Sequence, residues 1–555
     1  MIRFQGNGRA SATAPRGEGS RRELSLIAAA AAQTPGPVVV LWGKETPGSP
    51  RRWIRRFGER LVVITEGDVA AWRGAARVFP SDGRNQTDTR LAECGPAALI
   101  VDLVAVSAET QFGRWERFCF NVAVGGSYVL RQVDQQWWTA RIAAGAESRT
   151  AAATQELIAS AAAARPVGSM LALPKIHHHL LKVNELEADV LAAREPGLKI
   201  AVVTTRPAVD VVAPVRVVCH SDEEVSLPET SWTAPPLTCR WYRGDLHIRD
   251  WLYTQHGQTI LPPSFRHGWS RRPNQESVAG VGRRFAVAPA LGEPLDLPGT
   301  YFDVSGALPG HFGHIITESL AKLWAWPQAR AAIPDLKALC ILPPGQERPR
   351  FEDQLFAAAG VAAEDVVYLP QQELRLHSLV APTAAWHNAG PYHYHPVIRD
   401  TWAAMRAALV GPADDASPRR VFVSRGTDNR ACLNKPEVEA WFAEQGFAIV
   451  YPERLSIQEQ AQVFGHAEVL AGFAGSAMFN ALYSAGLQRM IVLTHTQYRA
   501  RNEWLYGAAL AEELHYFFSE PVNHRSQGAT GRAAFHSPWS FDFQRYGAEL
   551  SQACR

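Results

Sequence analysis

The stretch Val421-Phe422-Val423-Ser424-Arg425 is a short β-branched and aromatic run that ends on a single arginine, which predicts a buried strand with a charged tip. Three more apolar runs of strand length follow at intervals that leave room for helices: residues 447–451, 469–471 and 490–493. Capping patterns mark two helix starts, at Asn434 with Glu437 and at Ser456 with Glu459. Strands that alternate with helices in this way predict a parallel sheet.

The third of these strands runs into Gly472-Phe473-Ala474-Gly475-Ser476, a glycine-bounded turn that leads to the next helix. The unpaired N–H groups and the dipole of a helix start attract anions, so Gly475 and Ser476 are candidates to hold a diphosphate. Ligands of parallel sheets bind at the carboxyl ends of the strands, where Arg425 is also expected. The pattern therefore predicts a nucleotide-binding half-domain.

These residues resemble glycosyltransferase family 61, whose members transfer a sugar from a nucleotide-sugar donor with inversion at the anomeric carbon. The resemblance spans roughly residues 215–520. Its upstream block is Gly310-His311-Phe312-Gly313-His314-Ile315-Ile316-Thr317-Glu318-Ser319-Leu320, similar to the family's helix with histidine and glutamate. Its downstream block comprises Val423, Ser424, Arg425, Asn434, Glu437, Gly446, Phe447, Gly472, Gly475, Asn480 and Gly486. Two positions depart from the family pattern: Ala474 stands where a histidine is often found, and Lys435 where an acidic residue is common.

The resemblance implies an α/β fold of the GT-B type, with two facing Rossmann-like lobes. Residues 215–410 would form the N-terminal lobe on the acceptor side, and residues 411–520 the C-terminal lobe that binds the nucleotide-sugar. The donor-binding residues that it implies are Arg425, Asn434, Lys435, Gly472, Gly475, Ser476 and Asn480. No Asp-x-Asp stands at a strand end, so we expect that protein groups, and not a metal ion, neutralise the leaving diphosphate.

The resemblance therefore predicts an inverting, metal-independent hexosyl- or pentosyltransferase that uses a nucleotide-sugar, expected to be a UDP-sugar, and no other cofactor. The expected acceptor is a saccharide or glycoconjugate, in the biosynthesis of a surface or capsular polysaccharide. The rival hypothesis is a non-catalytic scaffold or binding protein built on decayed enzyme domains. The joint presence of Arg425, Gly475, His314 and Glu318 argues against decay.

The upstream block also has a meaning of its own, because its residues follow helical spacing. An apolar stripe predicts a helix that begins near Gly310 and ends at Pro327, with His311, His314 and Glu318 on another stripe. An inverting transfer needs one base to take the proton of the acceptor hydroxyl, and either His314 or Glu318 could be that base. The alternatives are a solvated helix face, an N-terminal cap histidine and a zinc site, although no HExxH motif surrounds the pair.

Two further histidine clusters are conspicuous in the sequence. Residues 386–396 form a loop rich in glycine, proline and aromatic residues, and we expect it at the acceptor side or rim of the sugar site with His311. The alternative is an ordinary aromatic-rich surface loop without a role at the site. The rim candidates in this loop are His387, Tyr392, His393 and His395. The triplet His177-His178-His179 falls in a helical pattern without further ligands nearby, so we interpret it as structural.

Residues 31–145 form a separate α/β pattern, with strands expected at 38–41, 61–64, 98–101 and 128–130. This part resembles a small class I methyltransferase, but residues 42–48 lack the glycine-rich loop that approaches a nucleoside. We expect a smaller Rossmann-like domain that has lost its cofactor, with S-adenosylmethionine-dependent activity as the alternative. The remaining divisions are a flexible arm at 1–30, a helical connector with a strand at 146–214 and a tail at 521–555.

Composition limits the remaining classes of function. The 555 residues carry 56 Lys and Arg against 54 Asp and Glu, a net charge of +2 that argues against nucleic-acid binding as the main task. Seven cysteines without a CxxC motif favour a reducing cytoplasm over a disulfide scaffold. We expect no membrane span, because no apolar run reaches about 18 residues, while peripheral membrane association and the oligomeric state stay open.

Overall fold

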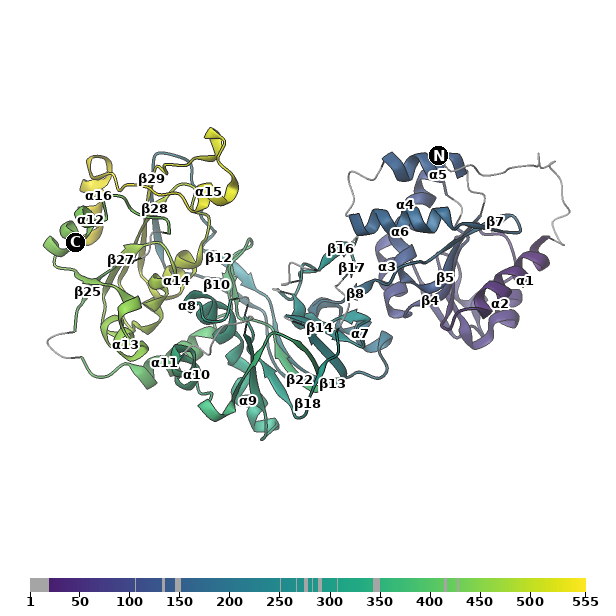
Figure 1. Ribbon diagram of the computed structural model, residues 1–555, viewed down its shortest axis with the longest axis horizontal. Helices are drawn as coiled ribbons and strands as arrows, with labels where there is room; N and C mark the ends of the chain where they lie inside the picture. Colours follow the sequence, from purple (N-terminus) through teal and green to yellow (C-terminus); the bar gives the residue numbers. More distant parts are fainter. Residues whose placement is uncertain are drawn as a thin grey trace. The chain divides into compact units, whose positions relative to one another are not determined.

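A computed structural model gives the fold in two compact units (Figure 1). Unit 1 comprises residues 1–198 and 252–292, and unit 2 comprises residues 199–251 and 293–555. The structure describes residues 19–104, 106–131, 135–144, 151–249, 251–265, 267–273, 278–281, 283–287, 292–306, 308–342, 350–413, 417–426 and 429–555.

Unit 1 is built on a seven-stranded sheet with the order β3-β2-β1-β4-β5-β7-β6. The strands β1 to β5 pair in parallel, whereas β7 is antiparallel to both of its neighbours. The strands are β1 Val38–Trp42, β2 Leu61–Thr65, β3 Arg77–Pro80, β4 Ala97–Asp102, β5 Val122–Arg131, β6 Arg165–Val167 and β7 Met170–Pro174. The four predicted strands all form, and β1, β2 and β4 are buried along their whole length, as continuous apolar runs predict.

The helices of unit 1 are α1 Gly19–Ala32, α2 Pro50–Phe57, α3 Arg84–Glu93, α4 Ala108–Phe118, α5 Gln135–Ala144, α6 Ala151–Ala162 and α7 Ala188–Arg194. Helix α1 corrects part of the predicted flexible arm, because Ile27 and Ala31 are buried in the core with β1. Residues 1–18 of that arm lie outside the described residues.

The connector differs from its prediction between residues 177 and 193. The histidine triplet lies in the loop between β7 and β8 (Leu180–Lys182) instead of a helix. The helical pattern of residues 180–193 forms a helix only from residue 185 onward, as a 3-10 turn at Glu185–Glu187 followed by α7. Strand β8 pairs with β15 (Thr259–Ile260) and β17 (Phe285–Val287), so distant partners override the local helical pattern. The structural interpretation of the triplet agrees with one contact, since His177 Nδ1 lies 2.7 Å from the buried Glu156 Oε2.

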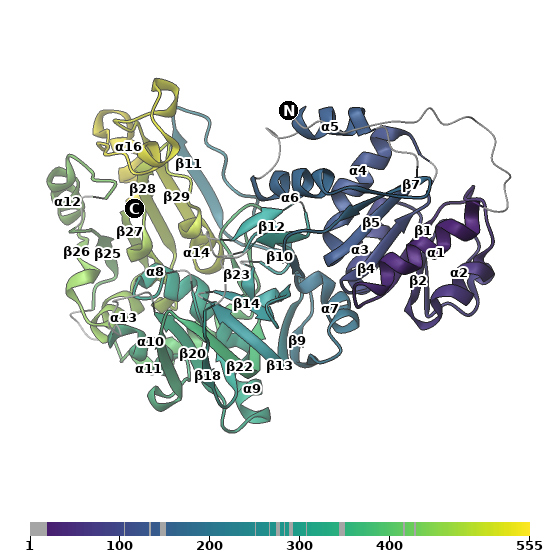
Figure 2. The same ribbon diagram turned by 45° about the vertical axis from the view of Figure 1, so that its right-hand side comes forward.

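Unit 2 contains the predicted parallel sheet, which has six strands in the order β11-β29-β28-β27-β25-β26. All five pairings are parallel, and Figure 2 shows β27, β28 and β29 side by side. The strands are β11 Arg216–Ser221, β25 Arg420–Val423, β26 Ala448–Val450, β27 Val469–Phe473, β28 Arg489–His495 and β29 Glu513–Ser519. The sheet therefore extends beyond the four predicted strands by β29 and by β11, which is some 200 residues distant in sequence from β25.

Helices around this sheet are α12 Lys435–Glu444, α13 Ile457–Gly465, the 3-10 helix η11 Ser476–Tyr483, α14 Asn502–Leu510, α15 Gly531–Phe535 and α16 Phe543–Cys554. The Ser456–Glu459 capping box forms at α13. The predicted tail at 521–555 is instead part of the fold, because α16 buries Tyr546 and Leu550 in one core with Phe422 of β25.

A second sheet of unit 2 joins β9 Lys199–Arg206, β13 Leu237–Arg249, β18 Leu295–Leu297, β19 Tyr301–Asp303, β20 Lys337–Leu342, β21 Val366–Pro370 and β22 Glu373–Pro382. The strands β19, β20 and β21 pair in parallel, and α8 Phe312–His314, α9 Trp326–Ala332, α10 Arg350–Ala358 and α11 Ile398–Leu409 belong to the same part. One continuous core joins the two parts of unit 2, with Ile316 and Leu320 in the same cluster as Met478 and Phe479. The fold is therefore α/β, and the GT-B arrangement stays a prediction.

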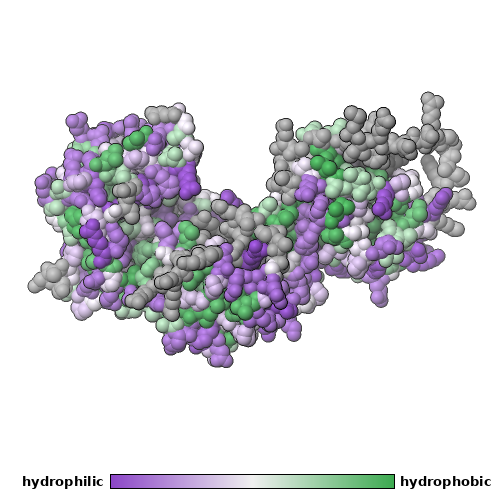
Figure 3. Space-filling view, viewed as in Figure 1, coloured by the Kyte–Doolittle hydropathy of each residue, from purple (hydrophilic) through white to green (hydrophobic). Residues whose placement is uncertain are grey.

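Hydrophilic and hydrophobic side chains alternate in small patches on the face in Figure 3. Among the described residues, no helix is both long enough and apolar enough to cross a bilayer.

Candidate functional site

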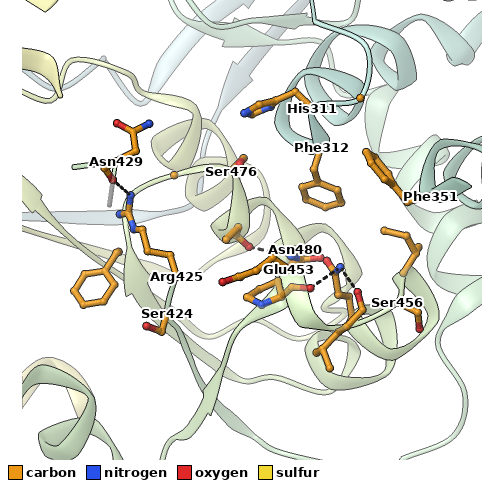
Figure 4. A pocket seen from close by; sticks show the side chains of 18 of the residues that line it. His311, Phe312, Phe351, Ser424, Arg425, Asn429, Glu453, Ser456, Ser476 and Asn480 are labelled. Atoms are coloured by element: carbon orange, nitrogen blue, oxygen red, sulfur yellow. Dashed lines mark hydrogen bonds between the residues drawn. The ribbon is translucent and has the colours of Figure 1, made fainter. Parts of the chain in front are cut away.

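A cavity of about 750 Å³ opens in unit 2 at the carboxyl ends of β25, β26 and β27 (Figure 4). Five segments line it: the loop after β25, the loop after β26 with the start of α13, the turn after β27, the residues 310–312, and α10. The position is the one at which parallel sheets bind ligands, because the strand ends and helix starts leave backbone groups unpaired there.

Two arginines stand at one end of the cavity. Arg425 Nη1 donates to the Asn429 carbonyl at 3.1 Å and Nη2 to the Ala474 carbonyl at 2.7 Å, and burial followed by the charge of Arg430 lowers the pKa of Arg425 to about 10. Neither guanidinium forms a salt bridge with a carboxylate among the described residues. The pair therefore offers positive charge to an anion without a carboxylate partner among the described residues.

Arg430 is held in an unusual conformation. Its φ is 54°, which is rare for a residue with a side chain, and its guanidinium carbon lies 5.1 Å from the ring centroid of Tyr498 and 5.6 Å from that of Phe535. Such strain is found where a surrounding structure imposes it, often at functional sites. Two aromatic rings thus fix the cation without neutralising it.

The turn after β27 comes close to both cations. A Cβ added at Gly475 would lie 3.3 Å from Arg430 Nη2 and 3.8 Å from Arg425 Nη1, so glycine keeps the space beside them open. Ser476 begins η11 and also lines the cavity. Asn480 is fully buried at the cavity wall, where its Nδ2 donates to the Ala477 carbonyl and its Oδ1 has no partner among the described residues. These groups can accept or donate hydrogen bonds to a bound anion or sugar.

The segment of residues 310–320, here called the histidine block, packs directly against this turn. An added Cβ at Gly313 would lie only 2.6 Å from Ser476 Cβ, so the absence of a side chain allows α8 to approach η11. His311 lines the cavity, and its ring centroid lies 5.0 Å from that of His314. Burial, followed by the neighbouring His314, lowers the pKa of His311, which favours its neutral form at neutral pH.

His314 and Glu318 form a hydrogen-bonded pair. His314 Nδ1 lies 2.8 Å from Glu318 Oε1, and the side chains are 29% and 17% exposed. Residues 315–319 form a π-helical turn, a conformation that recurs at functional sites. Pro327 corrects the predicted helix end: it stands in the first turn of α9, where proline is tolerated, and the chain stays helical to Ala332. The pair itself does not line the cavity, but the ring of His314 contacts that of His311, which does.

Three predicted donor residues lie away from the cavity. Asn434 does not cap α12 with its side chain; its Oδ1 accepts from the Phe541 N–H at 2.8 Å, and its Nδ2 donates to the Phe541 carbonyl at 3.0 Å. Lys435 Nζ donates to the Arg425 carbonyl at 3.2 Å. An added Cβ at Gly472 would lie 2.6 Å from the Val423 carbonyl oxygen, which assigns this glycine to strand packing. Lys435 therefore holds the loop of Arg425, whereas Asn434 binds the backbone of Phe541.

The predicted rim residues of the loop 386–396 are also outside the cavity. The loop is a hairpin of β23 Trp386–His387 and β24 His393–Tyr394, in which His387 and His393 are buried and stack at 4.6 Å. His395 Nε2 is 3.0 Å from the Pro207 carbonyl oxygen, and Tyr392 donates to the Arg499 carbonyl at 3.4 Å. The structure does not bring these side chains to the site, and their role with the acceptor stays a prediction.

Several cavity residues escaped the sequence reasoning, among them Arg430, Glu453 and Phe351. Glu453 lies three residues after the end of β26, the second strand of the parallel pattern, and this position could have marked it as a ligand-binding residue. Arg430 gave none, because a single arginine in a polar loop is not distinctive. Within the described part of the chain, no group of three or more His, Cys, Asp or Glu side chains is arranged to hold a metal ion.

Comparison with known families gives one match. Residues 312–491 match the model of the family described as Glycosyltransferase 61, and this segment contains His314, Glu318, Arg425 and Gly475. No curated protein matches the chain. The matched segment is about a third of the chain and contains the π-helical turn, the loop of Arg425 and Arg430 and the turn after β27, so residues 312–491 are similar to glycosyltransferase family 61.

Proposed function

We propose that this protein is an inverting glycosyltransferase that binds a nucleotide-sugar in the cavity of unit 2, with the diphosphate at Arg425 and Arg430. The observation that carries the proposal is the two guanidinium groups without a carboxylate partner, which converge on the glycine at 475. A diphosphate is the ligand that such a charge arrangement fits best, because charge-assisted hydrogen bonds to phosphate oxygens are strong and directional.

The reaction then follows from the groups next to this end of the cavity. The acceptor hydroxyl oxygen attacks the anomeric carbon, the bond from that carbon to the diphosphate oxygen breaks, and the nucleoside diphosphate leaves with the electron pair. The hydroxyl proton goes to His314 Nε2, while Glu318 accepts a hydrogen bond from Nδ1–H, which holds the tautomer and stabilises the imidazolium that forms. Arg425 and Arg430 stabilise the charge that develops on the leaving group. His311, between this pair and the cavity, is the candidate to contact the acceptor.

The finer parts of the proposal rest on the family resemblance and the sequence. The donor is a UDP-sugar, the acceptor a saccharide or glycoconjugate of a surface or capsular polysaccharide, and the location the cytoplasm. Metal independence rests on the absence of an Asp-x-Asp at a strand end, together with the two arginines that supply positive charge. The rival function is a binding protein that keeps the cavity without turnover.

A panel of nucleotide-sugars tests the proposal and separates it from its rival. We expect slow hydrolysis of at least one UDP-sugar by the wild-type protein, measured as release of UDP, and faster release with a suitable saccharide acceptor. Arg419→Ala removes an exposed arginine just before β25 that pairs with Glu468, and this control variant should release UDP at the wild-type rate. Binding of UDP without turnover of any donor would favour the rival, and no binding of any nucleotide would refute both.

A further inference from the structure

Among the described residues that line the cavity, Glu453 is the one with a carboxylate, and its position is fixed by the sheet. It belongs to the 3-10 turn η10 (Pro452–Arg454) that follows β26, the edge strand that pairs with β25. Its Oε1 accepts the Gly426 N–H at 2.6 Å. The Glu453 carboxylate, which follows β26, is therefore hydrogen-bonded to the loop after β25 that contains Arg425.

Gly426 leaves little freedom for this contact. An added Cβ at Gly426 would lie 2.9 Å from Glu453 Oε1, so the carboxylate packs closely against the backbone of the Arg425 loop. The second oxygen, Oε2, makes no hydrogen bond or salt bridge among the described residues. Since the residue is exposed and lines the cavity, this oxygen is available to a ligand.

The cavity changes character along its length. Figure 4 draws Arg425 and Asn429 at one side and Phe351 and Ser456 at the other, with Glu453 between them. Leu455, Ile457 and Phe351 add apolar surface near the start of α13. The cationic end, the carboxylate of Glu453 and the apolar end match in order the diphosphate, the ribose and the base of a nucleotide.

A carboxylate in an anion-binding cavity needs a physical reason, because it repels a diphosphate that it faces directly. It is favourable when it faces neutral hydroxyl groups, which donate to it in charge-assisted hydrogen bonds. In nucleotide-binding parallel sheets an acidic residue at the second strand plays this role toward ribose. We propose that Glu453 accepts hydrogen bonds from the ribose hydroxyls of the donor, with the base against Phe351; this inference rests on the proposed function.

Paired ligands that differ in one hydroxyl test the inference on the intact protein. For wild type, we expect UDP to bind about tenfold or more tightly than 2′-deoxy-UDP or 3′-deoxy-UDP in calorimetry. Each analogue lacks one ribose hydroxyl, so the Glu453 carboxylate loses a hydrogen bond that this hydroxyl would donate. In Glu453→Ala, UDP affinity falls by a similar factor and the deoxy penalty disappears. Inorganic pyrophosphate binds both proteins equally. Glu468→Ala, at an exposed carboxylate of the same sheet, leaves every affinity unchanged.

The outcomes distinguish this inference from its alternatives. If Glu453→Ala weakens pyrophosphate as much as UDP, the carboxylate only holds the Arg425 loop, and the ribose contact is refuted. Equal binding of UDP and both deoxy analogues to wild type also refutes it, while leaving the proposed function intact. Failure of wild type to bind UDP and pyrophosphate would refute the proposed function itself. Glu453→Gln keeps an acceptor for the Gly426 N–H and is the second variant to test if Glu453→Ala misfolds. In the folded Gln variant, UDP should lose its affinity advantage over the two deoxy analogues.

Discussion

His314 Nδ1 lies 2.8 Å from Glu318 Oε1, so the imidazole is oriented by a carboxylate on its own helical face. This bond occupies one ring nitrogen and leaves the other for a substrate, the arrangement in which a carboxylate fixes the tautomer of a general base. The π-helical turn of residues 315–319 sets the approach of the two side chains. Because this hydrogen bond couples the two residues, removal of either one should lower the catalytic rate.

Removal of either member should reduce turnover without affecting donor binding. We expect His314→Ala to lower kcat by about 100- to 10,000-fold and Glu318→Gln to lower it by a smaller factor, because the base is lost in the first and only its orientation in the second. The dissociation constant of UDP should stay within about threefold of wild type, since neither side chain lines the cavity. His377→Ala, at an exposed histidine of unit 2, is the control. Activity within about threefold of wild type in both variants would exclude the pair as the base.

The two arginines should contribute mainly to donor affinity. A lost charge-assisted hydrogen bond typically costs about 1.5 to 3 kcal/mol, so Arg425→Ala and Arg430→Ala should each weaken UDP binding about tenfold or more. Arg425 is half-buried and bonded to two backbone carbonyls, so its substitution should also lower Tm. Calorimetric titration beside thermal melting separates these effects, with Arg419→Ala as the exposed control. Unchanged UDP affinity in a folded Arg430→Ala protein would contradict the diphosphate assignment.

Chelation tests whether protein groups suffice to neutralise the leaving diphosphate. We expect the rate of UDP release from the preferred donor to change less than about twofold in excess EDTA, because Arg425 and Arg430 provide the charge that a divalent ion would otherwise supply. The measurement is the initial rate with and without chelator, followed by addition of magnesium or manganese. Loss of activity in EDTA and recovery with manganese would contradict the prediction.

The parallel sheet of unit 2 could be predicted from sequence because its signals are local. Continuous apolar runs mark buried strands, and the Ser456–Glu459 box marks a helix start that forms as expected. The tip of β25 and the turn after β27 then follow from the rule that ligands bind at the carboxyl ends of parallel strands. Arg425, Gly475, Ser476 and Asn480 line the cavity for this reason.

Long-range partners account for what the sequence did not predict. Asn434 resembles a helix cap, but its amide is bonded to the backbone of Phe541, 107 residues later. Residues 180–182 follow a helical pattern, yet they form β8 because strands near residues 260 and 286 pair with them. Arg430 becomes a site residue only through the rings of Tyr498 and Phe535. Such contacts depend on the tertiary structure, which no local window of sequence contains.

Unit 1 should not bind S-adenosylmethionine measurably. The loop after β1 is closed by its own contacts: Thr46 Oγ1 accepts the Gly43 N–H at 2.9 Å and donates to the Leu103 carbonyl at 2.9 Å. Asp102, at the end of β4, is held by a bidentate contact with Arg114. The polar groups at this edge are therefore satisfied within the protein, and no glycine-rich loop is present. A calorimetric dissociation constant in the micromolar range would contradict the prediction.

Glu352 should lower the free energy of unfolding as the pH rises from about 4.5 to about 7. The residue is fully buried at α10, its Oε1 accepts the Gly310 N–H next to His311, and its Oε2 has no partner among the described residues. Burial is the largest influence and raises the pKa of this carboxyl to about 7, from an ordinary value of 4.5. The folded state therefore holds the proton more tightly than the unfolded state, and this contribution to stability is lost between about pH 4.5 and pH 7.

Glu352→Gln should remove this dependence, because an amide keeps the acceptor for Gly310 and never ionises. At pH 8 the variant should exceed wild type in the free energy of unfolding by about 1 to 3 kcal/mol, whereas at pH 4 the two should agree. Denaturant titrations at both pH values measure the difference. Glu364→Gln, an exposed carboxylate of the same part of unit 2, should leave the pH dependence unchanged. If Glu352→Gln is equally or less stable than wild type at pH 8, the carboxyl is not penalised by burial, and its ionised form must instead stabilise the turn at Gly310 that leads into the histidine block.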